Sequence, residues 1–376
     1  MTLVQAITSL PSRRFHYRAW RQAPLLLAGL LALPAGAAEW NWADDPHAQR
    51  PEYAASTAAC ERVRDLRPPA RHRAATEQAR ALAGCDAQAL YYGIGMAADP
   101  VRARQCALLN VDTVGADAAP LFAGNDLLMT VYANGVGAER DLDLATALAC
   151  RIQGARAEVN GRVLHLQALK DSLDPGTGFH FCDDITSGLA MGYCAGHTAR
   201  LDADHRDRRL ERLARWWDEA DRAAFEPLRE AATAFAEASA GHEVDMSGTA
   251  RTALSIQHHH RLLDAFVALL ATLESDSLPV ADADERAAAD ARLNEVYRQL
   301  MAPRAPADGT SSDRDRLGYG TVTRADVRVA QRAWLVYRDA WIAFAAQRYW
   351  QMEDSVATWL TRRRADDLAT YLPRQD

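Results

Sequence analysis

The sequence predicts an all-α, disulfide-stapled protein in which a short solenoid of helical hairpins precedes a helical bundle. Three features support this fold class: a repeated motif in the first half, apolar residues at helical spacing in the second half, and an even number of cysteines. No run of alternating β-branched residues indicates a substantial sheet.

Residues 1–38 have the composition of a secretory signal peptide. They contain no Asp or Glu, carry four arginines and include a run of leucine and alanine. Ala35 and Ala37 fit the A-x-A preference of signal peptidase, so we expect a mature chain that begins near Glu39. The apolar run is about half of the ~20 residues that a membrane helix needs. We therefore expect a periplasmic or secreted protein without a membrane span after signal cleavage.

The charge of the chain bears on its partners. The formal net charge is -7, and removal of the four signal arginines would take it to about -11. Nucleic acid is then an unfavourable partner, because its phosphates repel an acidic protein. The charge would suit a basic protein partner, but ordinary solubility is the simpler interpretation of it.

All cysteines lie within residues 60–194, and their number is even. Export makes disulfides the expected state. We expect consecutive pairing: Cys60 with Cys85, Cys106 with Cys150, and Cys182 with Cys194. A zinc site is the alternative, but neither a C-x-x-C pair nor a suitable His spacing supports it, so we expect no metal and no cofactor.

A motif repeats with an offset of 42 residues: Tyr92-Gly-Ile-Gly with Asp99 and Ala103 recurs as Asn134-Gly-Val-Gly with Asp141 and Ala145. The glycines allow a tight turn between antiparallel helices, the aspartate can cap the next helix, and the alanine permits close packing. The motif is similar to Sel-one-like repeats, which are related to tetratricopeptide repeats. We therefore expect an N-terminal helical domain over residues 39–172, with two repeats at about 80–155.

The repeat offset also suggests a disulfide arrangement. Cys106 corresponds to Leu148, two residues before Cys150, so a bond between Cys106 and Cys150 would link the second helices of adjacent repeats. A bond between Cys60 and Cys85 would tie an N-terminal capping helix to the first repeat.

The turn-rich segment 171–178 predicts a domain boundary. Beyond it, apolar residues recur at helical spacing, which predicts a helical bundle over residues 178–376.

Two C-terminal stretches, 293–297 and 331–339, resemble the helix-pair signature of the LprI lysozyme-inhibitor family. The signature residues are Leu293, Asn294, Tyr297, Gln331, Trp334, Tyr337, Arg338 and Asp339. Cys182 and Cys194, which follow one another closely, are similar to the cysteine-bearing start of LprI-like domains. The resemblance implies an LprI-like helical domain and, in function, inhibition of a lysozyme by occlusion of its cleft.

The signature helices each carry an apolar face. Trp334, Tyr337, Trp341 and Phe344 share one face, and Leu293, Val296, Tyr297 and Leu300 share the other. We expect the two faces to pack against each other. Arg338 could then reach Glu295, and Gln331 could bond to a neighbouring helix.

The loop between these helices contains Asp313, Arg314, Asp315 and Arg316. It is the candidate partner site, because a guanidinium could meet the catalytic carboxylates of a lysozyme and the aspartates could meet basic residues at the rim of its cleft. A solvated connector is the alternative interpretation.

The sequence favours a binding protein over an enzyme. The alternative to a lysozyme inhibitor is a periplasmic interaction or toxin-immunity protein that holds a dedicated partner through its helical repeats. Consecutive histidines at 258–260 point around a helix and cannot converge on one metal; we expect one buried and two exposed rings. Asp183 and Asp184 more plausibly cap a helix than form an acid pair.

Overall fold

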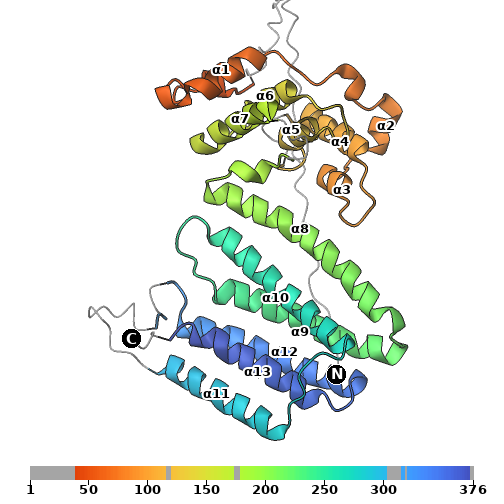
Figure 1. The fold of residues 1–376 in the computed structure, drawn as a ribbon, viewed down its shortest axis with the longest axis vertical. Helices are drawn as coiled ribbons and strands as arrows, with labels where there is room; N and C mark the ends of the chain where they lie inside the picture. Colours follow the sequence, from red (N-terminus) through yellow and green to blue (C-terminus); the bar gives the residue numbers. More distant parts are fainter. Residues whose placement is uncertain (1–38, 116–119, 173–177, 303–314, 318–319, 373–376) are drawn as a thin grey trace, which may run out of the picture. The chain divides into compact units, whose positions relative to one another are not determined.

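The computed structural model describes residues 39–115, 120–172, 178–302, 315–317 and 320–372. Within these ranges the chain is all-α, as predicted, and its only extended pairing is an isolated bridge between Arg316 and Thr323 (Figure 1). No helix in the same ranges combines the length and apolar character that spanning a membrane requires. The predicted signal peptide lies outside the described residues.

The first half consists of short helices. They are η1 (Trp42–Asp44), η2 (Pro51–Tyr53), α1 (Ala54–Val63), η3 (Ala70–His72), α2 (Thr76–Ala81), α3 (Ala87–Tyr92), α4 (Pro100–Val114), α5 (Asn125–Asn134), α6 (Leu142–Ala149), α7 (Arg156–Asp171) and η4 (Phe181–Asp184). Helices α3 and α4 pack as one hairpin, and α5 and α6 as a second.

The turns of these two hairpins share the same hydrogen bonds. Asp99 N–H donates to the carbonyl of Leu90 (2.7 Å), and Asp141 N–H donates to that of Tyr132 (2.9 Å). Each aspartate also caps the helix that follows it, and the first glycine of each turn has positive φ. A Cβ atom on Gly137 would lie 2.4 Å from the Pro100 carbonyl oxygen, so only glycine fits there. The repeated helical hairpin is therefore present, while its kinship with Sel-one-like repeats stays a prediction.

All six cysteines form disulfides, as expected, but the predicted pairing of the first four was wrong. The bonds join Cys60 to Cys150, Cys85 to Cys106, and Cys182 to Cys194. Cys85 lies just before α3, and the antiparallel hairpin brings it next to Cys106 on α4, so this bond closes one repeat instead of linking two. Helix α1 packs on α6 and α7, not on the first hairpin, and therefore brings Cys60 to Cys150.

A buried histidine on α8 joins the hairpins to the second half of the chain. The His197 ring stacks on Phe122 with centroids 4.3 Å apart, and its Nδ1 lies 2.5 Å from Gln88 Nε2. Arg200 donates to Gln88 Oε1, which turns the amide N–H₂ group of Gln88 toward His197. The Nε2 atoms of His180 and His197 lie 3.2 Å apart, and His180 Nδ1 accepts from the Cys182 backbone. With an N–H donor facing each Nδ1 atom, the proton of each neutral ring lies on Nε2, where the two rings face each other, so a second proton on either ring finds no acceptor here.

Acidification is expected to destabilise the fold through this histidine. Burial lowers the pKa of His197 from 6.5 to about 4. The unfolded state therefore binds the proton first, and the free energy of unfolding falls as the pH drops from 6.5 toward 4. Burial raises the pKa of Asp126 to about 6, which acts in the opposite direction because the folded state binds that proton first.

The contribution of His197 is isolated by comparison with a His197→Asn variant, in which Asp126 is unchanged. Urea unfolding followed by circular dichroism at pH 6.5, 5 and 4 should show a smaller loss of stability in the variant. An equal loss in both proteins would contradict the assignment.

The second half consists of longer helices. They are α8 (Gly188–Leu213), η5 (Ala214–Trp216), α9 (Glu219–His242), α10 (Arg251–Glu274), α11 (Ala283–Met301), α12 (Arg324–Arg348) and α13 (Glu353–Ala369). Side chains of Ser187, Asp218, Asp282 and Thr323 cap α8, α9, α11 and α12. Gly188 permits the close approach of α8 to the loop before α10, because a Cβ atom there would lie 1.9 Å from the Thr249 carbonyl oxygen.

The packing order of the bundle differs from the sequence order. Helix α8 packs on α10, α10 on α9, α9 on α12, α12 on α13, and α13 on α11. The aromatic face of α12 is buried, as expected, but it contacts α9 and α10: Tyr337 stacks on Phe235 (5.4 Å) and Trp341 meets Phe266 (5.5 Å). The expectation that the α11 and α12 faces pack against each other was therefore wrong, because α11 buries its apolar face mainly against α13.

Two hydrophobic cores follow one another along the chain. The first extends from Trp42 to Cys194 and the second from Trp217 to Leu368. The first core includes Phe179 and Phe181, which lie beyond the turn-rich segment at 171–178. The division into domains at that segment stays a prediction.

Candidate functional site

A groove separates α11 from α12 in the part of the chain that carries the signature residues. It has a volume of about 410 Å³. It is lined by Asp290, Leu293, Asn294 and Tyr297 of α11 and by Arg328, Gln331, Arg332, Leu335 and Arg338 of α12. The structure thus brings five of the eight signature residues to one surface.

The other three signature residues, Trp334, Tyr337 and Asp339, lie around this groove. Trp334 and Tyr337 are buried, and Leu293 belongs to the same core although its side chain also reaches the groove. The Arg338 guanidinium lies 5.3 Å from the Trp334 ring centroid and contacts Asp339 at 3.0 Å and Asp290 at 3.5 Å. The predicted partner of Arg338, Glu295, was wrong, because Glu295 sits one turn farther along α11 and pairs with Arg298.

Gln331 connects the groove to the interior, which confirms its predicted bond to a neighbouring helix. Its Oε1 accepts from Arg364 Nε on α13 at 2.8 Å. Arg364 in turn forms two hydrogen bonds to Glu243, of 3.0 and 2.6 Å, and both charged side chains are buried. The floor of the groove therefore rests on a fixed polar network.

Two arginines of the groove were missed by the sequence analysis. Arg328 and Arg332 are exposed, lie four residues apart and share one face of α12. Neither has an ion pair or hydrogen bond with any residue that the structure describes. Their positions in the sequence could have revealed them, because Arg328 lies three residues before the signature residue Gln331 and Arg332 lies directly after it.

The candidate loop is only partly described. Asp313 and Arg314 lie outside the described residues. The Asp315 carbonyl accepts from Arg324 N–H at 2.8 Å, and Arg316 forms the isolated bridge to Thr323. Since α12 begins at Arg324, this end of the loop is anchored one helical turn before Arg328 of the groove.

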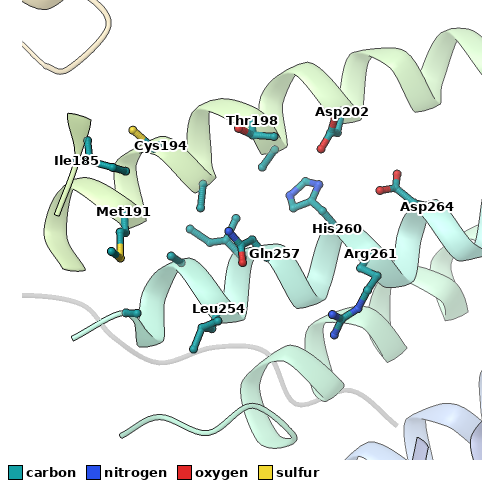
Figure 2. Close-up of a pocket in the computed structure, with 15 residues that line it drawn as sticks. Ile185, Met191, Cys194, Thr198, Asp202, Leu254, Gln257, His260, Arg261 and Asp264 are labelled. Atoms are coloured by element: carbon teal, nitrogen blue, oxygen red, sulfur yellow. The ribbon is translucent and has the colours of Figure 1, made fainter. Parts of the chain in front are cut away.

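A second hollow, of about 360 Å³, lies between α8 and α10 (Figure 2). Most of its lining is apolar, and Asp202, His260 and Asp264 lie together at one end. Arg206 donates to Asp264 Oδ1 at 2.8 Å and lies 2.6 Å from His260 Nδ1. Asp264 is therefore already paired with Arg206 within the protein.

The consecutive histidines are all half-buried, so the expectation of one buried and two exposed rings was wrong. Helix α10 is covered by both α8 and α9, which gives each ring a neighbour. His258 Nε2 lies 2.8 Å from Ser239 Oγ on α9, whereas His260 faces Arg206 on α8. Among the described residues, no group of three or more His, Cys, Asp or Glu side chains is arranged to hold a metal.

The acidic pair Asp183–Asp184 makes only local contacts. Asp183 accepts from the His180 backbone N–H at 2.8 Å and so caps η4, as expected. Asp184 lies 2.9 Å from His165 Nδ1 on α7. Both carboxylates are thus used in holding η4 in place.

Residues 280–368 match the family model described as Lysozyme inhibitor LprI. The matched segment contains α11, α12 and all but the last residue of α13, and it includes every residue that lines the α11–α12 groove. The predicted resemblance is confirmed for this segment. No curated protein and no solved structure gives a match.

Proposed function

We propose that this chain is an extracytoplasmic protein-binding protein that inhibits a lysozyme-type cell-wall hydrolase, and that the α11–α12 groove contacts the enzyme. The family match to a lysozyme inhibitor over residues 280–368 supports the class of partner. Three disulfides and the absence of a free cysteine among the described residues favour an oxidising compartment.

The observation that carries the proposal is the pair of arginines at the groove. A glycoside hydrolase of this kind places two carboxylates in a cleft. Arg328 and Arg332 present two guanidinium groups from one helix. Neither has to break an ion pair with a described residue in order to bind a partner. Arginine binds carboxylates in a two-pronged geometry that lysine cannot reproduce.

The loop at residues 313–316 extends the proposed contact. Arg316 bridges to Thr323, directly before α12, so Arg316 lies on the side of the groove where Arg328 stands. The groove would then hold the carboxylate-bearing part of the enzyme, and the loop would cover the adjoining rim.

Replacing both groove arginines by alanine is expected to weaken inhibition strongly. Each charge-assisted hydrogen bond contributes about 1.5–3 kcal/mol, which corresponds to at least about tenfold in potency per arginine. The measurement is lysis of peptidoglycan by several lysozymes, with the oxidised protein titrated to stoichiometry. The Arg328→Lys/Arg332→Lys variant keeps the charge and should recover only part of the loss.

The matched control is the variant Arg80→Ala/Arg156→Ala, which removes two exposed arginines from the first half of the chain. It should inhibit as well as the unaltered protein. Inhibition that survives the loss of Arg328 and Arg332 would exclude the groove and direct attention to Arg314 and Arg316. If the unaltered protein inhibits none of the lysozymes, the proposal fails, and a dedicated partner held by the hairpins becomes the better hypothesis.

A further inference from the structure

Two tryptophans stand almost fully in solvent at one end of the second half. Trp216 in η5 is 83% exposed, and Trp350 between α12 and α13 is 81% exposed. Large exposed aromatic side chains are unfavourable in water, and tryptophan is among the residues that most often dominate protein–protein contacts. This pair of indoles is therefore a candidate contact surface.

The neighbours of both tryptophans are anchored to one carboxylate. Trp217 Nε1 donates to Glu274 Oε1 at 2.9 Å, and the Tyr349 hydroxyl donates to the same oxygen at 2.5 Å. Trp217 is therefore fixed inward while its neighbour Trp216 faces solvent. Tyr349 is likewise fixed inward while its neighbour Trp350 faces solvent. The α8–α9, α10–α11 and α12–α13 connections meet at this end of the bundle (Figure 1).

An arginine holds these connections rigid. Arg348 donates to Glu274 at 2.8 Å and to Asp221 at 2.5 Å, and its guanidinium lies 5.0 Å from the Trp217 ring centroid. Gln351, directly after Trp350, has a φ of 66°, a conformation that residues other than glycine rarely adopt. The backbone that carries both exposed rings is therefore held by its neighbours before binding, which reduces the conformational entropy lost on association.

The charge around the tryptophans limits the partners that fit. In the segments 211–222, 274–276 and 348–354, acidic side chains outnumber basic ones. Such a surface is repelled by anionic lipid and attracted to a basic protein. Within the class of partner proposed above, a hydrolase with a basic exterior fits this surface.

The tryptophan end and the groove lie close enough for a single partner. The groove arginines Arg332 and Arg328 lie 16 and 20 residues before Arg348 on α12, about 24 and 30 Å along the helix. A standard interface buries about 800 Å² on each partner, a patch about 30 Å across, and so reaches from these arginines to the tryptophan end.

We infer that Trp216 and Trp350 form a second contact with the same hydrolase and bind its basic exterior beside the cleft. This inference rests on the proposed function. The groove arginines engage carboxylates inside the cleft, whereas the tryptophan end packs on cationic surface outside it.

The test measures the affinity of a strongly basic lysozyme for the full oxidised chain and for the variant Trp216→Ser/Trp350→Ser. Because both rings are exposed, the variant should fold normally, and its affinity should fall at least about tenfold. Succinylation of the lysozyme lysines should remove the part of the binding that depends on the tryptophans. The matched control, Met96→Ser/Leu189→Ser, removes two other exposed apolar side chains that lie outside α11 and α12, and it should bind normally.

The possible results separate this inference from the proposed function. Lysozyme binding that is unchanged in the tryptophan variant overturns the inference and leaves the groove intact. Tryptophan-dependent binding to phosphatidylcholine vesicles, with no effect on lysozyme affinity, overturns it in favour of a bilayer. If the unaltered chain binds no lysozyme, the proposed function fails, and the inference fails with it.

Discussion

Replacing Arg364 by alanine is expected to lower the free energy of unfolding by about 3–5 kcal/mol, because it leaves a buried carboxylate without its cation. The side chains of Arg364 and Glu243 are only 3% and 4% exposed. The two hydrogen bonds between them join α13 to the end of α9, and Gln331 of α12 accepts the third guanidinium bond. One substitution therefore disrupts the contacts of three helices. The measurement is urea unfolding at neutral pH.

The exposed pair Arg229–Glu226 provides the matched control. Both of its side chains are 55% exposed, so Arg229→Ala should change stability by only about 0–1 kcal/mol. The double variant Arg364→Met/Glu243→Leu removes both buried charges and should recover most of the stability lost in Arg364→Ala. A single Arg364→Ala variant as stable as Arg229→Ala would contradict the importance assigned to the buried pair.

Local features of this fold follow from sequence more reliably than its long-range pairings. The glycine–aspartate turns were predicted correctly because positive φ and helix capping depend on a few adjacent residues. The partners of Cys60 and Cys106 were not, because they depend on where α1 returns to the hairpins. Helix α1 packs on α6 and α7, and the repeated motif does not indicate this packing.

In the candidate site, too, local features could be predicted from the sequence and long-range arrangements could not. The aromatic spacing of α12 correctly predicted a buried face, and Gln331 was correctly assigned to a neighbouring helix. The groove itself was not foreseen, because it depends on α11 packing mainly against α13, which leaves Asp290, Leu293, Asn294 and Tyr297 of α11 facing α12 across an open groove. Arg328 and Arg332 become a potential contact only through that arrangement.

Removal of the Cys60–Cys150 disulfide is expected to cost more than removal of Cys182–Cys194, although both cross-links lie in or beside the first core. The two bonds close sequence separations of 90 and 12 residues. Loop-closure entropy then predicts a loss of about 4.6 kcal/mol for the longer loop and about 3 kcal/mol for the shorter one. The Cys60→Ser/Cys150→Ser and Cys182→Ser/Cys194→Ser variants should be compared by urea unfolding under oxidising conditions.

The two disulfides should also differ in how their loss affects the proposed function. Cys60–Cys150 anchors α1 to the second hairpin, so its loss should destabilise the first core while the groove between α11 and α12, built on the second core, keeps its geometry. Lysozyme inhibition measured well below the unfolding transition should therefore persist in the Cys60→Ser/Cys150→Ser variant. If inhibition were lost in a variant that remains folded, the first half of the chain would have to contribute to the contact, and the groove alone would not explain the function.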